Sequence, residues 1–266
     1  MHLFSPSAKP PPVAPATQTV LLWNLRHGGS NTRTPEQALH LLEYQPDIII
    51  LAELRASRGS QLLTMLAEQG LMHHAIAPAS SDRINRVAIV SREPLHSVAS
   101  TSPRLLTARV GELTIIAAHI PDESNPRARA DLWHGLLALA REHRDRPALI
   151  AGDFNTSRRG IDPARQGQTC ERHMGTLCSL GYRDVWISAE NSSPGTWSWA
   201  GPMGERHRLD GIFVSDQLHK CAENPVYDTT CVTQGLSDHA VFSVKIAPPR
   251  MWISHQNSPL PPESSL

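Results

Sequence analysis

Asp153 and Asn155 directly follow the apolar run 148–151. Such a run predicts a buried strand, and residues two apart on a strand point to the same side. The carboxylate and the amide are therefore expected at one rim of a sheet. A rim carboxylate can bind a cation or orient a water molecule, and a rim amide can donate to an anionic oxygen. The pair predicts chemistry on a phosphate-like group.

Similar polar residues stand where other apolar runs end or begin. The complete set is Asn24, Glu53, His119, Asp153, Asn155, Asp210, Asp238 and His239. Each member alone has a structural explanation, such as an ion pair between Arg208 and Asp210 or a buried core histidine at His119. An isolated buried carboxylate at Glu53 would be unfavourable, which favours a partner or a metal. The set as a whole indicates a site more strongly than any member does.

Phosphoester hydrolysis requires a cation and hydrogen-bond donors where negative charge develops. Glu53, with Asn24 nearby, offers hard oxygen ligands of the kind that Mg²⁺ binds. We expect Asn24, Glu53 and Asp238 as metal ligands. Mg²⁺ is the expected ion, with Mn²⁺ as an alternative.

The remaining roles follow from the side-chain types. Asp153 is expected to orient or deprotonate the attacking water, and Asn155 to donate to a phosphate oxygen. The imidazole of His239, next to Asp238, would act as a general base or stabilise the transition state. His119 would act as a general acid or contact the phosphate.

Three further residues are ambiguous. Arg158 and Trp197 are expected substrate contacts, for a neighbouring phosphate and for a base or sugar. Both also have ordinary explanations: a solvated loop for Arg158, and core or rim packing for Trp197 and Trp199, which we favour. Arg127 and Arg129 are expected on an exposed helix turn.

The elements that must position these residues alternate between β and α. Strands are predicted at 19–25, 47–54, 86–91, 95–100, 104–110, 113–119, 147–153, 196–199, 208–214 and 239–246. Helices are predicted from Thr34, as the cap, to about 44, then at 58–69, 126–143 and 168–180. Apolar runs and hairpin-like pairs in one chain favour a four-layer α/β/β/α sandwich of two packed mixed sheets. Residues 19–247 are the predicted domain, between a Pro-rich disordered arm at 1–18 and a Pro/Ser-rich disordered tail at 248–266.

Composition sets broad limits. The 266 residues carry 25 Lys plus Arg and 25 Asp plus Glu, so strong non-specific duplex binding is not expected. No apolar run is long enough to span a membrane, and no signal-peptide core is seen, which favours the cytoplasm without excluding another route of secretion. The four cysteines form no C-x-x-C pair, so a zinc site is not expected. We expect reduced thiols, with a Cys221–Cys231 bridge as the alternative in an oxidising compartment.

These motifs, in this order, resemble the endonuclease/exonuclease/phosphatase superfamily. The matching segments are 22–24 (LWN), 51–54 (LAEL), 118–121 (AHIP), 152–155 (GDFN), 208–212 (RLDGI) and 236–239 (LSDH). The resemblance spans about residues 19–246. It implies a deoxyribonuclease I-like fold, a divalent metal and a shared site that includes Asp210. His119 matches the deoxyribonuclease I and sphingomyelinase branches, but Asn85 stands where an acidic partner for that histidine is expected.

The expected function is therefore metal-dependent phosphoester hydrolysis, acting on DNA or RNA as a nuclease, by a monomer. One alternative is a phosphatase or phospholipase for a small or lipid substrate, although no amphipathic membrane helix is evident. A second alternative is a non-catalytic binding protein on the same fold. The intact acidic and histidine residues argue against the second alternative.

Overall fold

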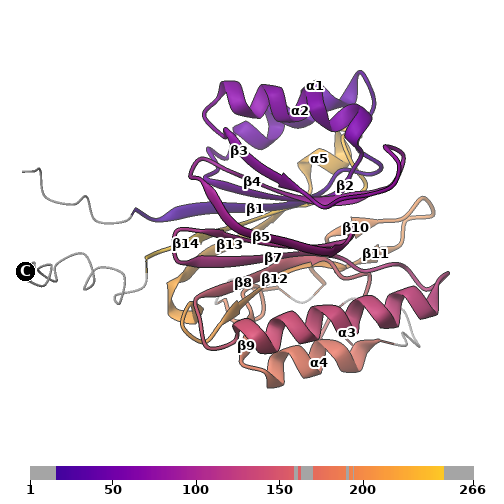
Figure 1. Cartoon of the computed structure of the whole chain (residues 1–266). Helices are drawn as coiled ribbons and strands as arrows, with labels where there is room; N and C mark the ends of the chain where they lie inside the picture. Colours follow the sequence, from indigo (N-terminus) through magenta and orange to yellow (C-terminus); the bar gives the residue numbers. More distant parts are fainter. Residues whose placement is uncertain (1–15, 159–160, 163–169, 190–191, 194, 249–266) are drawn as a thin grey trace, which may run out of the picture.

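The computed structural model describes residues 16–158, 161–162, 170–189, 192–193 and 195–248. In this part of the chain, two six-stranded sheets pack face to face and helices cover both outer faces (Figure 1). The predicted four-layer sandwich of two mixed sheets is confirmed. The predicted arm up to residue 15, and the predicted tail from residue 249, lie outside the described residues.

The first sheet has the strand order β13-β14-β1-β2-β4-β3. Its members are β1 (Gln18–Asn24), β2 (Ile48–Leu54), β3 (His73–Ile76), β4 (Arg86–Ser91), β13 (Ala222–Asp228) and β14 (Val241–Ile246). Strands β1 and β2 pair in parallel, whereas β14 runs antiparallel to β1. Helices α1 (Arg33–Leu42), α2 (Ala56–Glu68) and α5 (Thr230–Thr233) cover its outer face (Figure 1).

The second sheet has the order β5-β6-β7-β8-β12-β9. Its members are β5 (Leu95–Ser102), β6 (Leu105–Val110), β7 (Leu113–His119), β8 (Ala148–Asp153), β9 (Tyr182–Asp184) and β12 (Asp210–Ser215). Strands β7 and β8 are parallel, and β12 runs antiparallel to β8. Helices α3 (Pro126–His143) and α4 (Glu171–Ser179) cover the outer face, and a separate hairpin joins β10 (Trp199–Ala200) to β11 (Arg206–His207). A short 3-10 helix, η1 (His219–Cys221), precedes β13.

Alternation along the strands separates the core into an inner layer and two outer layers. On β1, Leu22 joins the cluster between the two sheets, whereas Leu21 and Trp23 join the cluster under α1 and α2. This is the period of two expected of a strand that is buried on both faces. Asn24 ends the inner row of β1 and so points toward the second sheet.

Several sequence-based expectations need correction. Thr34 does not cap α1: it lies inside the helix, and its hydroxyl donates to the carbonyl of Ser30. Strands β3, β9 and β13 were not predicted, because they are short or largely polar edge strands. Arg127 is exposed, but Arg129 is fully buried. All four cysteines are free thiols, and no described helix is long and apolar enough to cross a membrane.

Candidate active site

Three of the predicted residues lie side by side on neighbouring strands of the second sheet. The parallel pairing of β7 and β8 sets His119 opposite Asp153, and the antiparallel pairing of β8 and β12 sets Asp210 opposite Asp153. The ends of β7 and β8 and the start of β12 therefore meet at one edge. Gly152 permits this close approach, because a Cβ there would lie 1.9 Å from the carbonyl oxygen of Ala118.

The first sheet brings its own residues to the same edge. Asn24, at the end of β1, donates from Nδ2 to Asp153 Oδ2 at 2.9 Å and so connects the two sheets. Glu53 lies beside it, because Asn24 pairs with Ala52 on β2. Both sheets open here into a cleft of about 1050 Å³, which Asn24, Glu53, His119, Asp153, Asn155, Asp238 and His239 help to line.

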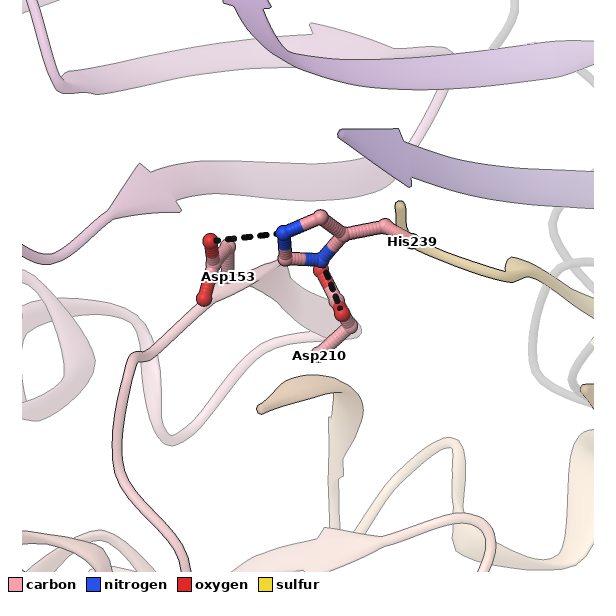
Figure 2. Close-up of side chains that lie close together, drawn as sticks. All are labelled: Asp153, Asp210 and His239. Carbon is pink, nitrogen blue, oxygen red and sulfur yellow. Dashed lines mark hydrogen bonds and ion pairs between the residues drawn. The ribbon is translucent and has the colours of Figure 1, made fainter. Parts of the chain in front are cut away.

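Asp153, Asp210 and His239 form what we call the catalytic cluster (Figure 2). The ring of His239 lies between the two carboxylates: Nδ1 is 2.7 Å from Asp210 Oδ2, and Nε2 is 3.9 Å from Asp153 Oδ2. All three side chains are buried. Burial alone would lower the pKa of His239, but Asp210 and then Asp153 raise it to about 10. His239 is therefore an imidazolium that Asp210 orients.

Asp153 carries the opposite perturbation. Burial, followed by the charge of Asp210, raises the pKa of Asp153 to about 7. The backbone N–H of Asn155 donates to Asp153 Oδ1 at 2.9 Å, and the Asn155 amide donates to Ile120 O at 2.9 Å and to Asp153 Oδ2 at 3.3 Å. Asn155 itself has a positive φ of 46°, an uncommon conformation outside glycine. The residue is thus held in a strained turn next to Asp153.

Glu53 is turned into the cleft by an irregularity of β2. The pairing of β2 with β4 shifts between Leu51 and Leu54, and Glu53 has a φ of 58°. Such bulges re-aim side chains at functional sites, and positive φ values store strain there. The backbone N–H of His27 donates to Glu53 Oε2 at 2.7 Å, and His27 Nδ1 lies 2.9 Å from the same oxygen. Glu53 Oε1 faces His119 Nε2 at 3.6 Å.

His119 has an arginine neighbour that the sequence did not suggest. Arg104 Nη1 lies 3.0 Å from His119 Nδ1 and 3.1 Å from Nε2. Burial and then the charge of Arg104 hold the pKa of His119 well below its usual value. Asn85 contacts His27 and Arg55 instead of His119. The nearest carboxylates to His119 are those of Glu53 and Asp153, at 3.6 and 3.9 Å.

The residues present suit a hard divalent cation. Asp210 Oδ1 is buried without a hydrogen-bond partner among the described residues, and burial together with the charge of Asp210 raises the pKa of Asp153. Ligand atoms of Asp153, Asp210 and His239 lie within 4.8 Å of one another. A doubly protonated His239 has no lone pair to give, so an oxygen site built on Glu53, beside this cluster, fits such a cation better. Asn24 Oδ1 already accepts from Arg26 N at 3.0 Å.

Asp238 lies at the rim of the site. Its Oδ2 is 3.6 Å from the Arg26 Nε atom, and its side chain is 28% exposed. The backbone of Asp238 is tied to the β10–β11 hairpin, because the N–H of Ala200 donates to Asp238 O at 2.9 Å. The side chain therefore faces an arginine at the rim, whereas that of Asp210 faces His239 in the interior.

Arg158 lies behind the site. It belongs to a second buried group, the arginine–aspartate cluster of Arg158, Arg208, Asp162 and Asp184. Asp184 Oδ2 contacts Arg158 Nη2 at 2.6 Å and Arg208 Nη2 at 2.9 Å, and Arg208 Nη2 also lies 2.6 Å from Asp162 Oδ1. Arg158 does not line the cleft, so we no longer assign it to substrate. Arg208 pairs with these residues and not with Asp210.

The aromatic contact also differs from expectation. Trp197 is not among the residues that line the cleft, and the guanidinium of Arg206 lies over its ring at 4.8 Å. Trp199 does line the cleft, where it stacks on His207 with 5.7 Å between ring centroids. The aromatic wall next to His239 is therefore Trp199, two residues further along the chain.

Arg129 has a supporting role that sequence reasoning missed. It donates from Nη1 to Pro121 O at 2.8 Å, and from Nη2 to Asn155 O and Thr156 Oγ1, each at 2.7 Å. The buried guanidinium therefore fixes the turn that carries Asn155. In the sequence, the position of Arg129 three residues after Pro126, in the first turn of the predicted helix, is the one hint of this role.

Comparison with known proteins agrees with this geometry. Residues 21–239 match the sequence model described as the Endonuclease/Exonuclease/phosphatase family, whereas no curated protein gives a significant match. The fold is similar to a 3′ phosphatase, NExo, from Neisseria, bound to a product DNA hairpin (TM-score 0.74, 20% identity, covering 87% of this chain and 100% of that one). It is also similar to an AP endonuclease from Archaeoglobus fulgidus (TM-score 0.73, 17% identity, covering 86% and 99%). The chain belongs to the endonuclease/exonuclease/phosphatase family.

Proposed function

We propose that this protein is a Mg²⁺-dependent phosphodiesterase that cleaves nucleic acid. The observation that carries the proposal is the row Asp210–His239–Asp153, whose His239 and Asp153 line the same cleft as Glu53. Family membership supports phosphoester hydrolysis as the reaction class. The similar solved structures include an enzyme bound to DNA, which supports nucleic acid as the substrate.

The roles of the residues follow from their protonation and contacts. Asp153 would receive the proton of the attacking water, because its pKa of about 7 suits a general base near neutral pH. His239, as an imidazolium held by Asp210, would donate to a non-bridging phosphate oxygen and offset its developing charge. Asn155 would donate from its amide after giving up one of its two contacts with protein oxygens.

Of the two roles expected for His119, general acid or phosphate contact, the second fits its surroundings better. A neutral imidazole has no acidic proton to give to the leaving oxygen, whereas it accepts readily from Arg104. We therefore assign His119 to phosphate contact. Glu53, with Asn24 and Asp238 nearby, would hold Mg²⁺. When bound, the ion would stabilise charge on the phosphate and the leaving oxygen.

One test measures hydrolysis of bis-p-nitrophenyl phosphate and of plasmid DNA with Mg²⁺ or Mn²⁺. Activity should require the divalent ion and stop in EDTA. Hydrolysis that persists undiminished in EDTA would contradict the proposed chemistry, and a lack of hydrolysis of every phosphoester tried would favour a non-catalytic binding protein.

A second candidate is phosphatase action on a terminal phosphate or a small phosphorylated molecule. The described residues that line the cleft support it, because their arginines are Arg26 and Arg104 and they include no lysine, whereas their carboxylates are Glu53, Asp122, Glu123, Asp153 and Asp238. A long polyanion needs many Lys or Arg contacts. A panel of DNA, RNA, abasic duplex, 3′-phosphorylated oligonucleotide, inositol phosphates and sphingomyelin would separate the candidates, and faster release of phosphate from monoesters than cleavage of diesters would select the phosphatase.

A further inference from the structure

The backbone of His239 is held by the end of β1, 216 residues earlier in the chain. Trp23 donates from Nε1 to His239 O at 2.9 Å. On the other side, the N–H of His239 donates to Ser237 Oγ at 3.1 Å, and that hydroxyl donates to Asn24 O at 2.7 Å. Strands β1 and β14 lie side by side (Figure 1). Two consecutive residues of β1 therefore fix both backbone groups of His239.

Trp23 does this from outside the cleft. Its side chain is fully buried in the cluster under α1, with its ring 5.8 Å from that of His40, and it does not line the cleft. An indole has a single polar group, the Nε1 donor. That group donates to the carbonyl of His239, whose side chain lies between Asp153 and Asp210.

Cys231 completes the contact with the carbonyl. Its thiol, on α5, lies 3.2 Å from His239 O, and a thiol is a weak donor. The single S–H also faces Asp228 O at 3.5 Å, so Trp23 is the stronger of the two donors to the His239 carbonyl. Buried polar groups with all partners satisfied tend to adopt one fixed geometry.

His239 needs such support because it precedes β14. The regular strand starts at Val241, and the ladder partner of His239 is an isolated bridge to Trp199. Nevertheless, its ring must keep Nδ1 at 2.7 Å from Asp210 while Nε2 faces Asp153. We propose that Trp23 is a positioning residue for catalysis, which sets the imidazole of His239 through its backbone carbonyl. This inference rests on the proposed phosphoester hydrolysis.

The test compares Trp23→Phe with Trp133→Phe in the full chain. Trp133 is also fully buried and stacks on Phe154, between Asp153 and Asn155, but its Nε1 has no hydrogen-bond partner in the described structure. It therefore matches Trp23 in burial and closeness to a catalytic loop without the hydrogen bond. Both changes trim the same ring, but Trp23→Phe also leaves a buried carbonyl without its indole donor, so Tm should fall more for Trp23→Phe and rates are compared well below both Tm values.

Kinetics on bis-p-nitrophenyl phosphate with saturating Mn²⁺ then separate positioning from packing. For Trp23→Phe, kcat should fall by roughly 10- to 100-fold, the loss expected when a catalytic group shifts by about 1 Å, with KM within about twofold. For Trp133→Phe, kcat should stay within about threefold of the native value. Equal losses in the two variants, or a loss confined to KM, would overturn the inference.

Cys231 provides a second pair of variants if Trp23→Phe does not fold. Cys231→Ser keeps a donor for His239 O, whereas Cys231→Ala removes it. The serine variant should retain kcat, and the alanine variant should lose about two- to tenfold with KM unchanged. Indistinguishable kcat values for the two would overturn the inference. An inactive native protein would instead refute the proposed function.

Discussion

Two buried polar clusters lie within a few residues of each other in the sequence, yet they are built in opposite ways. In the arginine–aspartate cluster, two guanidiniums face two carboxylates, with contacts as short as 2.6 Å. In the catalytic cluster, two carboxylates share one imidazole, and Asp210 Oδ1 has no hydrogen-bond partner. Arg158 comes three residues after Asn155, and Arg208 comes two before Asp210.

The pKa values express this difference. Burial alone would lower the pKa of Arg208, but Tyr227, Asp184 and Asp162 raise it well above its usual value, so Arg208 stays charged throughout the physiological range. In the catalytic cluster, burial and Asp210 raise the pKa of Asp153 to about 7, where a proton can be exchanged. The arginine–aspartate cluster, whose opposite charges balance, serves to hold the structure together. The catalytic cluster has an excess of negative charge and can therefore bind a cation and, with it, a phosphate.

The largest expected effect comes from removing the imidazole of the catalytic cluster. His239→Ala should lower kcat by roughly 10²- to 10⁴-fold, the range for loss of a positioned acid–base group. Tm should also fall, because the substitution leaves the buried carboxylates of Asp153 and Asp210 without the imidazolium between them, so rates are compared well below Tm. Initial rates on bis-p-nitrophenyl phosphate and a thermal melt check the two expectations. A near-native rate would remove His239 from the mechanism.

In the arginine–aspartate cluster, a substitution should lower Tm and leave kcat almost unchanged. Asp184→Asn keeps an oxygen for the backbone N–H groups of Trp186 and Ile187 but leaves two guanidiniums without that charge. Breaking a buried pair in this manner costs about 3–5 kcal/mol. Tm should therefore fall by about 6–20 °C, and kcat measured well below Tm should stay within about threefold. A stable but inactive Asp184→Asn protein would show that the cluster takes part in catalysis.

The next effect tests whether the excess negative charge serves a cation. Glu53→Gln should weaken the apparent affinity for Mg²⁺ by at least about 10- to 100-fold, because it replaces a charged ligand with a neutral one. Saturating Mn²⁺ should restore part of the rate. Titration of activity against each ion provides the measurement, and Asp184→Asn is the control, since it lies outside the cleft. A rate that neither ion restores would exclude Glu53 as a metal ligand.

The contrast also explains what the sequence can and cannot reveal. Asn24 and Glu53 end neighbouring parallel strands of one sheet, and His119 and Asp153 end neighbouring parallel strands of the other, so pattern alone places the members of each pair together. Only the packing of the two sheets brings Asn24 to Asp153. The partner of each polar residue is a different matter. Arg158 and Arg208 look alike as loop cations, but only the fold shows that Asp162 and Asp184 neutralise them.

The same limit applies to aromatic and edge elements. Trp197 and Trp199 are two residues apart, so a regular strand would turn both to the same side, but the observed strand starts only at Trp199. The few apolar neighbours in this segment do not reveal where so short a strand begins, and therefore which tryptophan enters the cleft. Arg129 is buried on α3, although helices rarely bury an arginine fully unless it has partners. Those partners, Pro121, Asn155 and Thr156, lie on two other loops.

The smallest expected effect concerns Tyr227, whose side chain touches both clusters. Tyr227 donates from its hydroxyl to Asp210 O at 2.8 Å and accepts from Arg208 Nη1 at 3.3 Å. Tyr227→Phe should lower the free energy of unfolding by about 0.5–1.5 kcal/mol and kcat by at most about threefold. Tyr182→Phe is the matched control, because its buried hydroxyl bonds only to Ala140 O, at 3.2 Å.

Combining Tyr227→Phe with His239→Ala or with Asp184→Asn tests whether the two clusters act separately. If the arginine–aspartate cluster and the catalytic cluster act independently, the effect of Tyr227→Phe on stability should depend on whether Asp184 is intact. Its effect on kcat should instead add to that of the second change within about 0.5 kcal/mol. Arg208 provides the reason, since it contacts both Tyr227 and Asp184. A larger coupling in kcat between Tyr227→Phe and Asp184→Asn would mean that the ion pairs also tune Asp210 through its backbone.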